Sequence, residues 1–77
     1  MGRIKVKGIY SADAINKVSK AVTSQLDVNL RAMNIDCHDG IFEGNISLYI
    51  KDIQDLNSLM DKIRMIKGIE VVKRNLN

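Results

Sequence analysis

The chain has 77 residues, of which 45% are hydrophobic and 27% are charged, and its formal net charge is +3. This length predicts one domain, and the apolar fraction argues against a disordered chain. No apolar run approaches the roughly 20 residues of a membrane span, the first residues do not resemble a signal peptide, and one cysteine cannot build a disulfide framework. We therefore expect a cytoplasmic domain over residues 1–77, excised from a longer chain and without a membrane partner.

The beginning of the chain predicts a strand and then a helix. Apolar and basic residues alternate along Arg3–Tyr10, which indicates a strand with one buried face. Ser11 is a candidate N-cap, because its hydroxyl can accept a hydrogen bond from a backbone amide that has no partner within the helix. The helix is expected from Ala12 to about Gln25, with an apolar stripe at Ile15, Val18, Val22 and Leu26.

The middle of the chain predicts a β-hairpin that turns at Asp39-Gly40, two residues that tolerate positive φ. Before the turn, Val28–Asp36 is extended, but its alternation slips, and a β-bulge near Arg31-Ala32 would reconcile the two phases. After the turn, a buried face of Gly44, Ile46, Leu48 and Ile50 alternates with Asn45, Ser47, Tyr49 and Lys51.

The last third of the chain predicts a second helix and a final strand. Asp52 is the N-cap candidate, and Lys67-Gly68 is expected to end the helix with a cationic last turn and a left-handed glycine. Ile69–Arg74 is the final strand, and Leu76 is expected to hold the tail. The apolar stripe of the helix contains Ile53, Leu56, Leu59, Met60, Ile63 and Ile66.

The order of these elements, βαββαβ, predicts an α+β fold. Right-handed crossovers place both helices on one face of a four-stranded antiparallel sheet, which is the ferredoxin-like sandwich. The other face of the sheet is expected to be polar, with residues Lys5, Lys7, Asn45, Ser47, Tyr49, Glu70, Val72 and Arg74.

No residue pattern indicates catalysis, a metal or a cofactor. Cys37-His38 is the only Cys/His pair, whereas structural zinc takes four ligands. The loop after the first strand lacks the arginine of acylphosphatases and the Cys-x-x-Cys of copper chaperones. This loop could still hold an anion or a small polar ligand at the helix N-terminus, since Tyr10 and Ser11 supply hydroxyls and Gly8 permits close approach. An ordinary capped turn is the alternative.

Binding of RNA on the open sheet face would normally use several aromatic residues for base stacking. Tyr49 is the only aromatic residue expected there, although Lys5, Lys7 and Arg74 could contact phosphates. The net charge mildly favours anionic partners but is small for a nucleic-acid-binding domain. An autonomous RNA-binding module is therefore disfavoured, and contact with RNA as part of a larger protein stays open.

Five segments of the chain form a recognisable pattern together: Ile4-Lys-Val-Lys-Gly8, Asn34-Ile35, Asp39-Gly-Ile-Phe-Glu-Gly44, the segment from Leu56, and the ending Arg64-Met-Ile-Lys-Gly-Ile-Glu-Val-Val-Lys-Arg74. This pattern resembles ACT domains, and most of all the C-terminal ACT domain of RelA/SpoT enzymes, which make and degrade (p)ppGpp. The resemblance covers nearly the whole chain.

The resemblance implies a non-catalytic regulatory domain of a GTP pyrophosphokinase or ppGpp hydrolase, which relays a signal to the catalytic domains in the stringent response. Its implied partners are other domains of the parent enzyme, the ribosome or RNA in the context of that parent, and a second copy of the domain. The copies would pair through strand or helix edges or through their sheet faces. The alternative is an amino-acid-binding regulatory domain or subunit of an amino-acid biosynthetic enzyme.

The ligand loop departs from the family pattern. ACT domains of this kind typically have Asp-Arg-x-Gly between the first strand and the first helix, whereas this chain has Tyr10-Ser11-Ala12-Asp13. The candidate ligand-binding residues are therefore Gly8, Tyr10, Ser11 and Asp13. Asp13 places a side chain and a negative charge where the backbone is usually bare, so we expect it to block the customary amino-acid site. The alternative is that Asp13 binds the amino group of the ligand, so that the site is altered and not lost.

Overall fold

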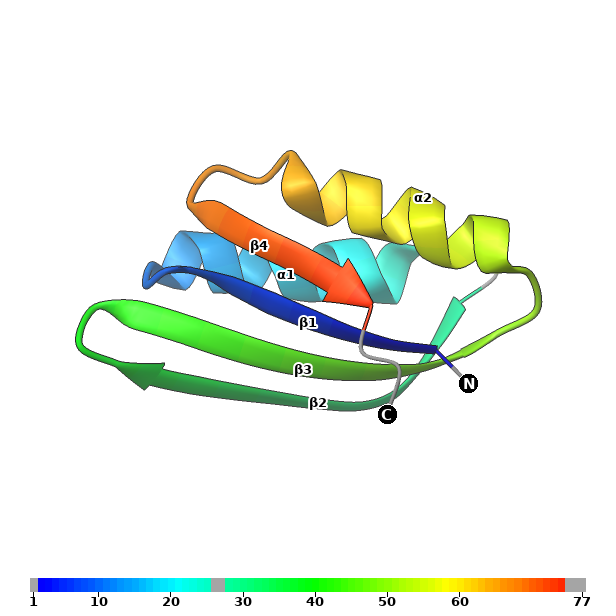
Figure 1. Ribbon diagram of the computed structural model, residues 1–77, viewed down its shortest axis with the longest axis horizontal. Coiled ribbons are helices and arrows are strands. Elements are labelled where there is room, and N and C mark those ends of the chain that lie inside the picture. The colour runs from blue at the N-terminus through cyan, green and yellow to red at the C-terminus, as the bar shows by residue number, and fades with distance from the viewer. Residues whose placement is uncertain (1, 26–27, 75–77) are drawn as a thin grey trace.

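The computed structural model describes residues 2–25 and 28–74 and contains two helices and four strands (Figure 1). The elements follow one another in the predicted order. They are β1 (Gly2–Ile9), α1 (Ala12–Ser24), β2 (Val28–His38), β3 (Ile41–Ile50), α2 (Ile53–Arg64) and β4 (Ile69–Arg74).

The four strands form one antiparallel sheet in the order β2-β3-β1-β4, so β2 and β4 are its edges. Both helices lie on the same side of this sheet (Figure 1), and the other side is left open. The predicted ferredoxin-like sandwich is therefore confirmed.

The predicted caps and turn are present. Ser11 is extended and its hydroxyl accepts a hydrogen bond from the Ala14 amide at 3.3 Å, while Asp52 Oδ1 accepts from the Gln54 amide at 2.9 Å. Asp39 and Gly40 have φ values of 53° and 76°. Two consecutive residues with positive φ make the turn whose twist matches that of the strands it joins.

The boundaries of two elements differ from the prediction by two residues or more. β2 continues two residues beyond Asp36, because pairing with β3 extends to the turn. α2 ends at Arg64, earlier than expected, because the following amides of Met65 and Ile66 bond to carbonyls three residues back. The C-cap of α2 is therefore Met65 and not Gly68 as predicted. Gly68, with φ of 98°, lies in the connection that leads into β4.

The predicted bulge in β2 is confirmed, since the pairing with β3 shifts between Leu30 and Ala32. Arg31 is the extra residue, and the shift brings Leu30 and Met33 to the same face although they are three residues apart. The sequence therefore contained enough information for this irregularity.

The predicted facing of β4 is wrong. Val72 pairs with Val6 and is 8% exposed, so it points toward the helices, and Arg74 pairs with the buried Ile4.

A second register shift, opposite Lys7 and Gly8, leaves Glu70 without a partner in β1. The open face of β4 therefore carries Val71 and Lys73. The cause of the error is that Val71 and Val72 are both apolar, so alternation alone does not say which one is buried.

The core lies between the sheet and the two helices. Within the apolar stripes, Ile15 and Ile66 are only half-buried, and Ile53 is 43% exposed at the first position of α2. The expected contributions of Leu26 and Leu76 lie outside the described residues. The largest fully buried side chains are Phe42, Ile4, Ile46, Leu48, Leu56, Leu59 and Ile63.

Candidate functional site

A shallow depression of about 380 Å³ lies where β1 ends and α1 begins. Two parts of the chain that are distant in the sequence form it: the end of β1 with the first turns of α1, and the connection from α2 to β4. The residues that line it are Ile9, Ser11, Asp13, Lys17, Lys67 and Gly68.

The charges in this depression favour an anionic group. The Asp13 carboxylate lies 3.1 Å from the Lys17 ammonium group, one helical turn away, and 75% of the Asp13 side chain is exposed. Lys67 supplies a second cation from the other wall, and the N-terminus of α1 adds its partial positive charge. A small carboxylate or phosphate group would therefore meet more positive than negative charge here.

Only two of the four predicted ligand residues line the depression, namely Ser11 and Asp13. The Ser11 hydroxyl already serves as the N-cap of α1. Tyr10 is 48% exposed, and its amide donates to the Gly40 carbonyl at 2.8 Å, which ties the loop to the hairpin turn. Sequence reasoning missed Lys17 and Lys67. The spacing of Lys17 from Asp13 was a usable signal for the first, whereas nothing local indicated the second.

Gly8 has a packing role in the structure. A Cβ atom at this position would lie 2.4 Å from the Gly68 carbonyl oxygen and 3.1 Å from Phe42 Cε1. The Ile9 amide donates to the same Gly68 carbonyl at 2.9 Å. The backbone that approaches Gly8 closely is therefore that of the α2–β4 connection.

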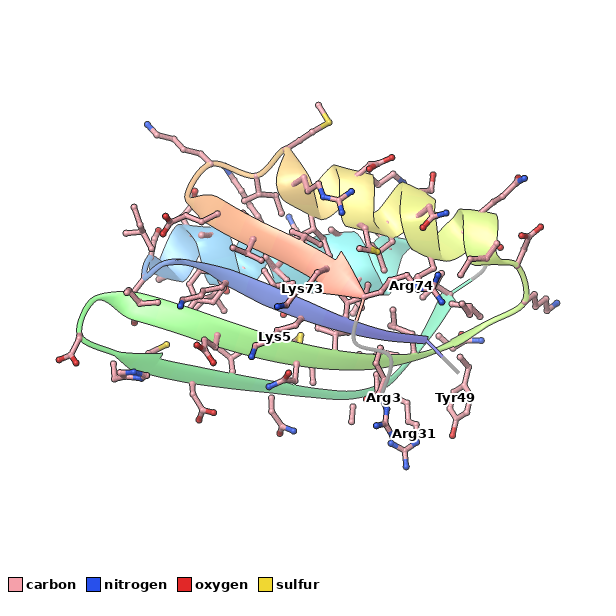
Figure 2. The ribbon with its side chains drawn as sticks, viewed as in Figure 1. Arg3, Lys5, Arg31, Tyr49, Lys73 and Arg74 are labelled. Atoms are coloured by element: carbon pink, nitrogen blue, oxygen red, sulfur yellow. The ribbon has the colours of Figure 1, made fainter. Side chains whose placement is uncertain are left out.

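The open face of the sheet is a second candidate site, and its two halves differ in charge. Lys5 and Lys73 are directly paired on β1 and β4, and Arg3 pairs with Ser47 (Figure 2). Further along β1, Lys7 pairs with Glu43, and their charged groups are 3.9 Å apart. One half of this face thus gathers cations, whereas the other contains both signs.

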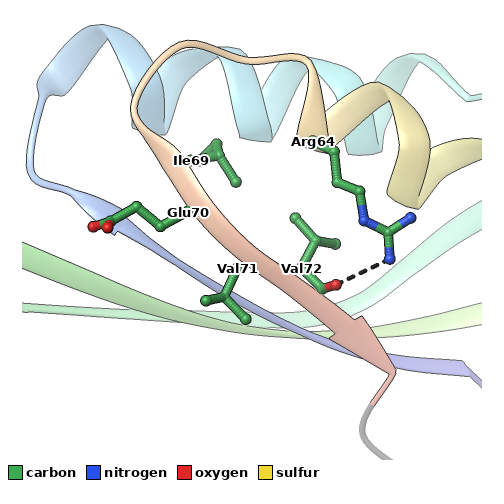
Figure 3. Close-up of a pocket in the computed structure, with 5 residues that line it drawn as sticks. All are labelled: Arg64, Ile69, Glu70, Val71 and Val72. Atoms are coloured by element: carbon green, nitrogen blue, oxygen red, sulfur yellow. Dashed lines mark hydrogen bonds between the residues drawn. The ribbon is translucent and has the colours of Figure 1, made fainter.

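A groove of about 420 Å³ runs along the outer edge of β4 beside the end of α2 (Figure 3). Arg64 lies across it and donates from Nη2 to the Val72 carbonyl oxygen at 3.0 Å, while its Nη1 contacts Asp61 Oδ1 at 2.9 Å. Glu70 and Val71 also line the groove. The arginine satisfies a carbonyl group at the sheet edge that another strand would otherwise pair with.

The described residues contain no group of three or more His, Cys, Asp or Glu side chains that could hold a metal ion. Cys37 and His38 are consecutive in β2, so their side chains point to opposite faces of the sheet. In residues 2–25 and 28–74, no helix is both long enough and apolar enough to cross a membrane.

Comparison with known proteins places this geometry in a family. A model of the ACT domain matches residues 1–74. The crystal structure of the ACT domain from the GTP pyrophosphokinase of Chlorobium tepidum is similar, with a TM-score of 0.89 and 28% sequence identity over 96% of this chain and 95% of that one. The solution structure of the same domain gives a TM-score of 0.87 and 29% identity, covering 99% and 85%.

An ACT domain protein from Streptococcus pneumoniae shares the fold, with a TM-score of 0.66 and 17% identity over 95% of this chain and 86% of that one. No curated protein sequence gives a significant match. The family model covers all six structural elements from β1 to β4, and ACT domains are regulatory and non-catalytic modules. This chain therefore belongs to the ACT domain family.

Proposed function

We propose that this chain is the C-terminal regulatory domain of a (p)ppGpp synthetase/hydrolase of the RelA/SpoT type, acting in the cytoplasm in the stringent response. The observation that carries the proposal is the similarity to the ACT domain of a GTP pyrophosphokinase over almost the full length of both chains. In this role the domain does no chemistry. It changes its docking to other domains or to an external partner, and the catalytic domains respond.

The ending of the chain supports this assignment because it acts as one structural unit. Arg64 at the end of α2 donates a hydrogen bond to the Val72 carbonyl in β4. Between these two residues, the Gly68 carbonyl accepts a hydrogen bond from the Ile9 amide at the end of β1. The run from Arg64 to Arg74, which carried the sequence resemblance, thus closes the fold and covers one edge of the sheet. A role in holding the fold together explains why these residue types occur together.

The partner within an assembly would be a second copy, joined through the β2 edge. β2 is 11 residues long, and its helix-side face presents half-exposed apolar residues, with Leu30 40% exposed and Met33 and Ile35 partly buried. Because Arg64 occupies the β4 edge, β2 is the better edge for strand pairing. Pairing of β2 with its own copy is isologous, so it closes into a dimer with one continuous sheet.

The proposal is tested by exchanging domains. The ACT domain of the Chlorobium tepidum GTP pyrophosphokinase is replaced by this chain, and (p)ppGpp synthesis is compared with that of the intact enzyme and of an enzyme without the domain. We expect the exchanged enzyme to respond to its regulating signal as the intact enzyme does. A response equal to that of the deletion, from an exchanged enzyme that is folded, contradicts the proposal. The gene is also expected to encode synthetase and hydrolase domains upstream of residue 1.

An amino-acid-responsive regulator of a biosynthetic enzyme is the second candidate. The depression at the start of α1 favours it, because Lys17 and Lys67 could face the carboxylate of an amino acid. The Asp13 carboxylate, paired with Lys17, opposes it by reducing the positive charge available to the ligand. Binding of free amino acids distinguishes the two candidates, as described below.

A further inference from the structure

An exposed apolar cluster lies at one corner of the open sheet face. Ile9 at the end of β1 pairs with Ile41 in β3, and Val71 in β4 pairs with Lys7. In β1 the buried residues alternate with Lys7 and Ile9, so these two and their strand partners point away from the helices. Ile9, Ile41 and Val71 are 57%, 37% and 40% exposed. We name these three residues the apolar corner.

Two cations beside the apolar corner have no anion of their own. Lys7 lies 3.9 Å from Glu43, whereas Lys5 is paired with Asn45 on one side and with Lys73 on the other (Figure 2). Within residues 2–25 and 28–74, neither Lys5 nor Lys73 forms an ion pair or a side-chain hydrogen bond. Like charges directly opposite one another destabilise a sheet. An occupant of this face that carries carboxylates would therefore be favoured.

The backbone of the sheet restricts the conformation of such an occupant. The face of a sheet presents side chains, because the backbone groups of its strands are paired in the plane of the sheet. A segment that is buried against the face must therefore satisfy its own amides and carbonyls, as a helix does. Packing of helices on a sheet is also the arrangement on the opposite face (Figure 1). An extended peptide would need a sheet edge, and Arg64 already bonds to the Val72 carbonyl at the β4 edge.

The spacing of the two features defines the helix further. Lys5 lies four residues before Ile9 in β1, which corresponds to about 13 Å at about 3.3 Å per residue. A helix rises 1.5 Å per residue, so it covers this distance in about nine residues. A helix that runs along β1 would therefore carry its acidic side chains about nine residues from its apolar ones, on the same face.

We propose that the open face docks an acidic amphipathic helix of a partner protein, with apolar side chains on the apolar corner and carboxylates on Lys5 and Lys73. A second copy of this chain fits the face less well. Basic side chains outnumber acidic ones on it, so stacking two copies would bring like charge against like charge. The inference does not depend on the identity of the parent enzyme.

The experiment titrates the 15N-labelled 77-residue chain with a synthetic helical peptide and follows the amide chemical shifts. The peptide has two leucines one turn apart and two glutamates about nine residues further along the same face. We expect saturable shifts in the apolar corner and at Lys5 and Lys73. A control peptide, in which the glutamates lie on the opposite face of the helix, should bind about 2- to 30-fold more weakly, the contribution of two exposed ion pairs.

Substitutions in the chain test the two halves of the contact. Ile9→Thr combined with Ile41→Thr should weaken binding about 15-fold, because each buried methylene contributes about fourfold. Threonine keeps the β-branched side chain that suits a strand. Lys5→Glu combined with Lys73→Glu should also weaken binding of this peptide, and a peptide with lysines in place of its glutamates should restore it.

The matched control reverses the same charge elsewhere, by Lys20→Glu in α1 and Lys51→Glu after β3. This pair should bind like the unmodified chain at about 0.15 M salt, where exposed charges more than about 8 Å apart are largely screened. Circular dichroism establishes that each variant is folded.

Several outcomes would overturn the inference. They are the absence of saturable shifts at millimolar peptide, equal losses in the two charge-reversed variants, and shifts confined to the depression at α1, which Ile9 also borders. Shifts of the apolar corner that appear when the chain is concentrated without peptide would instead assign the face to a second copy. Displacement of the peptide by oligouridine, together with unchanged oligouridine binding by the Ile9→Thr and Ile41→Thr double variant, would assign it to a nucleic acid.

Discussion

Substitution of Gly8 by alanine distinguishes a packing role of this glycine from a role in ligand approach. The new Cβ atom would lie 2.4 Å from the Gly68 carbonyl oxygen and 3.1 Å from the Ile69 Cα atom. Both are backbone atoms, so they cannot move aside by changing a rotamer. Relief requires β1 to separate from the α2–β4 connection, which stretches the 2.9 Å hydrogen bond from the Ile9 amide to Gly68.

The expected cost follows from these contacts. Overpacking of a filled site costs about 1–3 kcal/mol, and loss of a backbone hydrogen bond adds about 1 kcal/mol. Alanine also restricts the unfolded chain, which returns about 0.4–1 kcal/mol where the native backbone suits it. We therefore expect Gly8→Ala to lower the free energy of unfolding by about 1–3.6 kcal/mol, with no ligand present. For a domain of this size, each kcal/mol lowers Tm by about 4–8 °C.

Gly44→Ala is the matched control, because Gly44 is also a buried strand glycine without positive φ. A Cβ atom there would meet Ile35 Cγ1 at 3.6 Å and Val6 Cβ at 4.0 Å, which are ordinary contacts. This variant should be neutral or more stable by up to about 1 kcal/mol. Urea denaturation of both variants gives the comparison. A Gly8→Ala chain as stable as the unmodified one would refute the packing argument and restore a ligand-only role for Gly8.

Four further predictions concern the ligand loop, the β4 edge, catalysis and assembly. If Asp13 blocks the amino-acid site, none of the twenty amino acids at millimolar concentration should raise Tm, whereas a bound ligand at 100 times its Kd would stabilise the domain by about 2.7 kcal/mol. A saturable rise in Tm of the unmodified chain contradicts the blockage. A rise that appears only in Asp13→Gly shows that the Asp13 side chain causes the blockage. Arg64→Ala should lower the free energy of unfolding in urea denaturation by about 1–2 kcal/mol and increase concentration-dependent association, because it uncovers the Val72 carbonyl. Unchanged stability and association would show that the arginine does not protect this edge. The purified chain should neither make nor hydrolyse (p)ppGpp, and turnover that persists through repeated purification would contradict this. Light scattering at high micromolar concentration should detect a dimer that Leu30→Lys dissociates, and a monomer before any substitution rules out self-association of this domain.

The local features of this protein could be predicted from its sequence because each depends on a few neighbouring residues. Ser11 and Asp52 cap helices with their own side chains, and Asp39-Gly40 turns the hairpin because both residues accept positive φ. The β2 bulge was predictable because apolar residues on both sides of Arg31 had to reach one face. Together these features sufficed for the fold and, with the family resemblance, for the class of protein.

The facing of β4 and the composition of the candidate sites depended on the tertiary structure. Val71 and Val72 are equally apolar, so only pairing with β1 decides that Val72 is buried and that Lys73 joins Lys5 on the open face. Lys67 reaches the depression at α1 because Gly68 packs against β1, a contact between segments about 60 residues apart. Periodicity records which side of an element is buried, but which elements meet, and in which register, is decided by packing between residues distant along the chain.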